Sequence, residues 1–102
     1  MARTPLTPED LADALADLPG WAGDVHGIHR RVQGIDFRTA ARHVLALADV
    51  ADALDHHPDV EISYGTLTVH LLTHSVDAVT ELDVEFARRA DEVIDAQADD
   101  DA

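Results

Sequence analysis

The chain has 102 residues and a mass of 11.0 kDa, which is enough for one small domain. Its formal net charge of −14 argues against groove binding to nucleic acid and against docking on anionic lipid, because both need a basic surface. Cysteine is absent, which excludes disulfides, thiolate metal sites and a cysteine nucleophile. No apolar run approaches the ~20 residues of a membrane span and no secretory signal is visible, so we expect a cytoplasmic protein.

Two elements are predicted in the first third of the chain. A helix is expected to begin after Thr7, because Thr7 can cap it and Pro8 fits its first position, and Pro19–Gly20 ends it. Between Trp21 and Ile35 the pattern is weaker, with glycines as turn formers and few β-forming residues, and it predicts a short β-hairpin. Trp21 is expected to anchor the core rather than to contact a ligand.

The strongest helical pattern runs from Asp36 to Leu54. Asp36 is the predicted cap, and Pro58 ends the helix because the residue before a proline is driven toward extended geometry. His43 falls on the polar side of this helix and is expected to face solvent. The apolar residues recur at the spacing of one buried stripe: Phe37, Ala40, Ala41, Val44, Leu47, Ala48, Ala51 and Leu54.

A second hairpin and a last helix complete the predicted elements. The segments Val60–Tyr64 and Leu67–Leu71 alternate with period two on either side of Gly65, which predicts a β-hairpin. The last helix is expected to begin near Thr80, where Thr80-Glu81-Leu82-Asp83 resembles a capping box with Asp in the place of Glu.

The order helix, hairpin, helix, hairpin, helix predicts an α+β fold with two layers, in which helices cover one face of a four-stranded antiparallel sheet. We expect one domain over residues 1–96 and an acidic, disordered tail over residues 97–102. An uncovered sheet edge in so small a domain favours a homodimer or homotetramer. The like charge of the subunits opposes association over a Debye length of ~8–10 Å, so moderate salt should favour the oligomer.

Three histidines form the main candidate site. His56 and His57 lie where the long helix ends, and the following hairpin can bring His74 back beside them. Asp52 precedes His56 by one helical turn and can orient its ring. These residues allow three interpretations: general acid/base catalysis near neutral pH, a zinc site with three histidine ligands, or ordinary surface and helix-end histidines.

The chain also resembles a known family. The residues that carry the resemblance are Leu54-Asp55-His56-His57-Pro58, Tyr64, Thr73-His74 and Asp83, with Leu18-Pro19-Gly20-Trp21 and Asp36-Phe37 upstream. Together they are similar to the signature of the pterin-4a-carbinolamine dehydratases. The resemblance implies a four-stranded antiparallel sheet with helices on one side, assembled as dimers or tetramers. It also implies loss of water from 4a-hydroxytetrahydropterin to give quinonoid dihydropterin, with a small pterin substrate and with neither metal nor cofactor.

The resemblance assigns roles to particular residues. It implies that His56, His57 and His74 are the catalytic histidines and that the supporting or substrate-binding residues are Asp52, Asp55 and Asp83. An imidazolium can protonate the departing hydroxyl while a neutral imidazole takes the proton from the ring nitrogen. We expect His56 and His74 to exchange these protons and His57 to hold the pterin edge.

A different kind of function is also compatible with this fold. Relatives of the fold serve as a dimerisation cofactor of a transcription factor and as an assembly chaperone for a carboxylase, so a non-catalytic interaction module is the alternative hypothesis. The three histidines distinguish the two hypotheses, because a scaffold that acts only through protein partners has no need of them.

Overall fold

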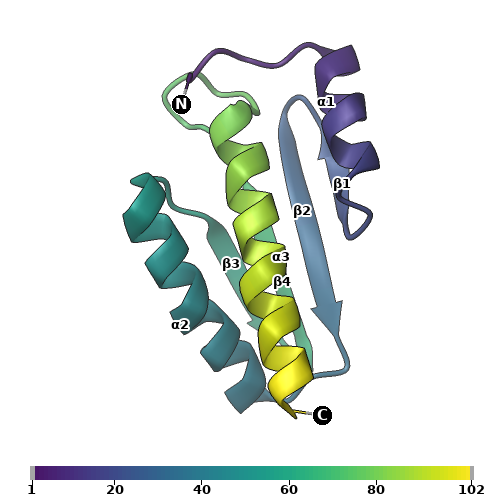
Figure 1. Ribbon diagram of the computed structural model, residues 1–102, viewed down its shortest axis with the longest axis vertical. Helices are drawn as coiled ribbons and strands as arrows, with labels where there is room; N and C mark the ends of the chain where they lie inside the picture. The colour runs from purple at the N-terminus through teal and green to yellow at the C-terminus, as the bar shows by residue number, and fades with distance from the viewer. Residues whose placement is uncertain (1, 102) are drawn as a thin grey trace.

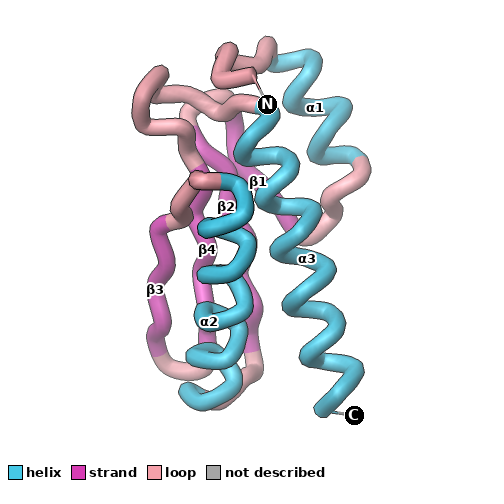
Figure 2. The backbone as a smooth tube through the Cα atoms, turned by 60° about the vertical axis from the view of Figure 1, so that its left-hand side comes forward, coloured by secondary structure: helices cyan, strands magenta, loops and turns pink. Residues whose placement is uncertain are grey.

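The computed structural model describes residues 2–101, with side chains described as far as residue 96. Its elements in chain order are α1 (Pro8–Ala16), β1 (Trp21–Asp24), β2 (Gly27–Gln33), α2 (Phe37–Leu54), β3 (Asp59–Ser63), β4 (Thr66–Leu71) and α3 (Glu81–Asp101) (Figure 1). The strands form one antiparallel sheet in the order β1-β2-β4-β3, and the helices lie on one face of it (Figure 2). The predicted α+β class and its two-layer arrangement are confirmed.

Two further expectations concern the C-terminal tail and membrane-spanning helices. The acidic tail predicted over residues 97–102 falls where side chains are not described, and that prediction stays untested. Among the described residues, no helix is both long and apolar enough to cross a bilayer.

The core lies between the sheet and α3. On β4, alternate residues point toward the helices, and Leu67, Val69 and Leu71 are buried. From α3, Phe86 and Ala90 pack against this face at the four-residue spacing of one helical side. The alternation of β4 is a feature that the sequence predicted.

Trp21 joins the first hairpin to α3. Its ring is buried, and its indole N–H donates to Asp91 Oδ1 at 2.8 Å. The Arg30 guanidinium, next to Trp21 across β1 and β2, donates to the same oxygen at 2.5 Å. The prediction that Trp21 anchors the core is confirmed, and the polar end of its ring is satisfied by the helix that covers it.

Helix α2 presents a different face to the core than the sequence predicted. Phe37 is 73% exposed, whereas His43 is only 2% exposed, so the expectations of a buried Phe37 and a solvent-facing His43 are both wrong. The buried positions are Ala40, His43, Leu47, Val50 and Ala51, which also recur at helical spacing. Hydropathy alone predicted that the more apolar flank of the helix is buried. Packing against the sheet and α3 instead buries the neighbouring stripe, which contains His43.

The predicted helix starts are confirmed by their caps. Thr7 Oγ1 accepts from the backbone N–H of Asp10 at 3.1 Å, and Asp36 Oδ1 accepts from the N–H of Thr39 at 2.7 Å. Hydrogen bonding to Thr39 lowers the pKa of the Asp36 carboxyl below its usual value.

Replacing Phe86 by Ala should test how far α3 holds the sheet. The Phe86 ring is fully buried, so Phe86→Ala is expected to lower the free energy of unfolding by about 3–5 kcal/mol through lost burial and a new cavity. Denaturant unfolding followed by the fluorescence of the single tryptophan measures this. Arg88→Ala is the matched control on the same helix, because its exposed ion pair with Glu85 should change stability by less than about 0.5 kcal/mol.

Candidate active site

Three segments meet at one end of the sheet, the upper end in Figure 1. The first is the junction from α2 to β3, which carries His56 and His57. The second is the loop after β4, which carries Thr73 and His74, and the third is the first turn of α3, which carries Asp83. The topology therefore brings the segment with His56 and His57 close to the segment with His74, as the sequence predicted.

The end of α2 sends His56 into the core. Asp55 follows the helix in the left-handed conformation, with φ 48° and ψ 47°, which reverses the chain as a helix C-terminal turn usually does. The backbone N–H of His56 then donates back to Ala51 O at 3.1 Å. Because the chain turns here, the His56 ring is buried while the next residue, His57, is exposed.

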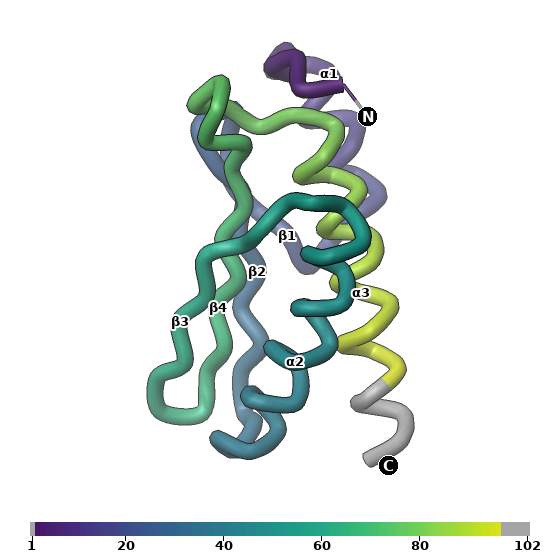
Figure 3. The backbone as a smooth tube through the Cα atoms, turned by 90° about the vertical axis from the view of Figure 1, so that its left-hand side faces the viewer, coloured from purple at the N-terminus to yellow at the C-terminus, as the bar shows by residue number. Residues whose placement is uncertain are grey.

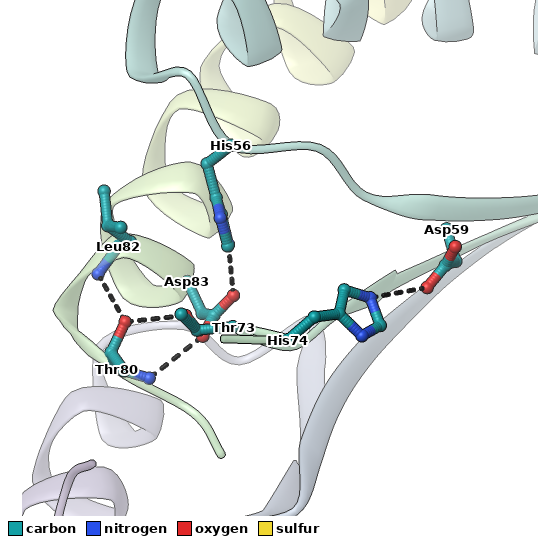
Figure 4. Close-up of polar contacts among 7 residues, drawn as sticks. All are labelled: His56, Asp59, Thr73, His74, Thr80, Leu82 and Asp83. Carbon is teal, nitrogen blue, oxygen red and sulfur yellow. Dashed lines mark hydrogen bonds and ion pairs between the residues drawn. The ribbon is translucent and has the colours of Figure 1, made fainter. Parts of the chain in front are cut away.

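The carboxylate of Asp83 lies at the centre of the buried polar contacts (Figure 4). Its side chain is fully buried. One oxygen, Oδ1, contacts His56 Nε2 at 2.6 Å, and the other, Oδ2, accepts from the Thr73 hydroxyl at 2.8 Å and from the Thr80 N–H at 2.9 Å. A carboxylate arranged to accept in this way makes His56 Nε2–H the donor and leaves the lone pair of the neutral ring on Nδ1.

The same contacts form the predicted cap of α3. Thr80 Oγ1 accepts from the N–H of Leu82 at 3.2 Å, while Asp83 reaches back to the N–H of Thr80, as the last residue of a capping box does. The Thr73 hydroxyl proton is already used on Asp83, so the Thr80 hydroxyl donates to Thr73 Oγ1 at 2.8 Å. Helix start, loop and His56 therefore share one hydrogen-bonded network.

His74 lies beside this network but is not part of it. Its side chain is 69% exposed and points away from Asp83 toward β3, where Nε2 lies 3.5 Å from Asp59 Oδ2 (Figure 4). The loop that holds it is closed by Thr73 N–H donating to Ala78 O at 3.1 Å. The site thus has one buried, oriented imidazole and, beyond Thr73, one imidazole open to solvent.

The supporting carboxylates differ from the sequence expectation. Asp83, rather than Asp52, orients His56, and Asp52 is exposed on the last turn of α2. Asp55 acts locally as the helix-ending residue. Thr73, Thr80 and Asp59 were not among the predicted site residues, although Thr73 and Thr80 stood in the quoted motifs, and only the folded contacts reveal what they bind.

Tyr64, the aromatic residue of the sequence signature, lies away from these histidines. It occupies the turn between β3 and β4, at the opposite end of β3 from Asp59, and is fully exposed. Five strand residues separate it from the His57–Pro58 segment, so Tyr64 lies six residue steps from Pro58, about 20 Å at the usual rise per residue. Within one chain, therefore, Tyr64 does not line the site that His56 and His74 mark.

Among the described residues, no three histidine, aspartate or glutamate side chains are spaced to hold a metal ion. The expectation of a site that works without metal stays a prediction, and its test is given below.

Comparisons with known proteins show which family the chain resembles. The family model for pterin 4 alpha carbinolamine dehydratase matches residues 4–93. A relative from Streptomyces avermitilis, named as a candidate pterin-4-alpha-carbinolamine dehydratase, is 42% identical over 94 residues, which cover 91% of this chain and 93% of the relative. A relative from Koribacter versatilis with the same name is 39% identical over 93 residues, which cover 91% of this chain and 98% of that relative.

Solved structures show the same fold. A Brucella melitensis protein described as a transcriptional coactivator/pterin dehydratase has a TM-score of 0.83 and 35% identity, and the match covers 89% of this chain and 99% of that one. A pterin dehydratase-like protein identified as a RuBisCO assembly factor in the alpha-carboxysome has a TM-score of 0.57 at 17% identity, over 72% of this chain and 86% of its own, and shares the fold alone.

The fold and site define a small α+β domain whose histidine–aspartate pair lies at one end of an antiparallel sheet. With the match over residues 4–93 and relatives near 40% identity, the chain belongs to the pterin-4-alpha-carbinolamine dehydratase family.

Replacing Asp83 by Asn should show how much the buried network contributes to stability. The new amide presents N–H groups where three donors already point, so we expect Asp83→Asn to lower the free energy of unfolding by about 3 kcal/mol. Asp52→Asn, the same change at an exposed carboxylate, should stay within about 0.5 kcal/mol of the wild type. Equal denaturation curves for the two variants would contradict this view of Asp83.

Proposed function

We propose that this protein dehydrates 4a-hydroxytetrahydropterin to quinonoid dihydropterin, and so recycles a pterin cofactor, by histidine acid/base catalysis. The observation that carries the proposal is the buried contact between His56 and Asp83 beside the exposed His74. Family membership supports the substrate class.

The reaction needs one proton delivered and one removed. The C4a–O bond breaks and the hydroxyl leaves as water, so an acid must protonate that oxygen. A base must take the proton of a ring nitrogen as the C=N bond forms. Two imidazoles in different protonation states perform both transfers near neutral pH.

His56 is suited to the part of the base. Asp83 accepts the Nε2 proton and so selects the tautomer in which Nδ1 is free to take a proton. The negative carboxylate also offsets the positive charge of the ring once it is protonated, as in other histidine–aspartate pairs. Burial and the threonine contacts hold Asp83 in place, so the ring needs little reorganisation during the reaction.

His74 is suited to the part of the acid. Its exposed ring can meet a substrate hydroxyl and regain its proton from water, and its Nε2 lies 3.5 Å from Asp59 Oδ2. His57, also exposed, is proposed to hold the pterin edge together with the exposed carboxylates of Asp52 and Asp55.

The alternative is a non-catalytic module that acts through protein partners. The fold shared with a RuBisCO assembly factor favours it, since this architecture occurs in a protein described by an assembly function. A scaffold could retain the buried Asp83 network for stability. It would not need His74, whose side chain is 69% exposed, so the two hypotheses differ at this histidine.

Histidine substitutions test the proposal directly. His56→Ala and His74→Ala should each lower the dehydration rate by about 10²-fold or more, because each removes one acid/base group. Stopped-flow absorbance of freshly made 4a-hydroxytetrahydropterin, corrected for the uncatalysed reaction, measures the rate. His57→Ala should act chiefly on KM.

The matched control is His26→Ala, since His26 is exposed in the turn between β1 and β2 and its rate should equal that of the wild type. The buried His43 is unsuitable for this purpose. If the His56, His74 and His26 variants all retain the wild-type rate, the interaction module is the better hypothesis.

Metal independence is a separate prediction. The purified protein should contain no stoichiometric zinc, and prolonged treatment with a chelator should leave the dehydration rate unchanged. Elemental analysis and the same stopped-flow assay measure both quantities. Zinc that is lost together with the activity, and that restores it when added back, would favour a metal site.

A further inference from the structure

A hollow lies on the face of the sheet that the helices do not cover. Ile28 and Leu71 are buried under the helices, so their strand neighbours His29 and His70 point to the opposite face. Figure 3 shows α2 and α3 on one side of β3 and β4, and among the described residues no other element covers the opposite side. The hollow measures about 430 Å³ and is lined by both histidines and by Asp59. This volume falls within the range of small-molecule sites.

Three polar side chains form a row across this hollow. His29 is the Cα partner of His70 between β2 and β4, and His70 is the partner of Asp59 between β4 and β3. The centroids of the two imidazole rings are 5.9 Å apart. His70 Nε2 lies 3.9 Å from Glu61 Oε2, too far for a hydrogen bond. The row therefore presents two imidazoles and one carboxylate to a ligand, and the mechanism above uses none of them for proton transfer.

Asp59 joins the hollow to the candidate active site. It lines the hollow, and its Oδ2 lies 3.5 Å from Nε2 of His74, the proposed acid. Figure 4 shows the His74 ring pointing toward Asp59 and away from Asp83. A substrate whose hydroxyl meets His74 therefore has the hollow beside it.

The chemistry of the pterin determines which part of it reaches the hollow. The hydroxyl leaves from C4a, and N5 alone separates C4a from C6. A side chain on C6 therefore begins two bonds from the reacting carbon. The pyrimidine edge, for which His57 is proposed, lies on the other side of C4a. The C6 side chain is thus the part of the substrate that leaves the ring system nearest to His74 and Asp59.

We propose that this hollow binds a polyhydroxyalkyl side chain on C6 of the pterin, and that His29, His70 and Asp59 make the protein prefer substrates that carry one. The proposal rests on the proposed dehydratase function and names the substrate class of that same site. The turn between β1 and β2 borders the hollow, and no contact with the side chain is assigned to it.

Hydrogen-bonding capacity favours hydroxyl groups over other side chains. A hydroxyl both donates and accepts, a neutral imidazole does the same through its two nitrogens, and a carboxylate accepts. An apolar side chain would leave the polar groups of His29, His70 and Asp59 facing it without partners. A phosphate would meet the carboxylates of Asp24 and Asp59 in a chain of net charge −14.

Calorimetry with stable 7,8-dihydropterins tests the hollow without any turnover. The probes carry a methyl group, a 1,2,3-trihydroxypropyl group or the phosphate monoester of that triol on C6. The triol should bind about tenfold more tightly than the methyl compound, because it adds hydrogen bonds to the row. It should also bind more tightly than the phosphate ester. Equal affinities for triol and methyl compound, or tighter binding of the ester, would overturn the proposal.

Substitutions in the row show whether these side chains cause the preference. His29→Leu and His70→Leu remove a donor and an acceptor, so each should weaken triol binding about tenfold and leave binding of the methyl compound unchanged. His70→Gln keeps both functions and should retain the preference. Gln33→Leu is the matched control, because Gln33 is exposed on the same strand and face as His29 but lies outside the hollow. An equal loss for both compounds would make the histidines merely structural and refute the assignment.

Kinetics separate this proposal from the proposed function. The 4a-hydroxy forms of the methyl and triol compounds should share one kcat, because the side chain contacts no reacting atom, while KM should be about tenfold lower for the triol. His70→Leu should raise KM for the triol alone. Dehydration of both substrates with equal KM would keep the function and overturn the hollow. A wild-type protein that binds these pterins without dehydrating them would reject the function, while calorimetry still judges the hollow.

Discussion

The Asp83 carboxylate is the contact on which the site depends, because one buried group joins three parts of the chain. It caps α3 through Thr80, holds the loop after β4 through Thr73 and fixes the ring of His56. A buried charge is costly unless every lone pair finds a donor, and here the donors come from segments far apart in sequence. The helix cannot start, the loop cannot close and the imidazole cannot be oriented independently of one another.

This coupling explains why the sequence predicted the elements better than the site. Alternation, caps and turn residues are local, and they located the hairpins and the starts of all three helices. The capping box at Thr80 was predicted for the same reason. The contact of its Asp83 with His56 was not predicted from local pattern, because 27 positions separate the two residues. The local spacing of a helix instead suggested Asp52, which lies one turn before His56. In the structure Asp52 stays exposed, while the left-handed Asp55 reverses the chain and His56 is buried.

The errors on α2 have a related cause. Hydropathy weighs each residue by its own transfer energy and cannot tell which of two adjoining stripes the sheet will cover. His43 lies in the covered stripe, while Phe37 and Leu45 lie on the flank. A single chain that exposes such side chains leaves part of the hydrophobic driving force unused. The mismatch between the apolar stripe and the buried stripe therefore shows which flank of α2 the fold leaves uncovered.

The two ends of β3 differ in how far the chain covers their side chains. At its start, rigid burial holds His56 while His57 and His74 remain open, and at its end an exposed Tyr64 occupies a turn that Asn would form at lower cost. The edge strand therefore carries the rigid, hydrogen-bonded part of the site at one end and the most exposed large apolar side chain of the described chain at the other.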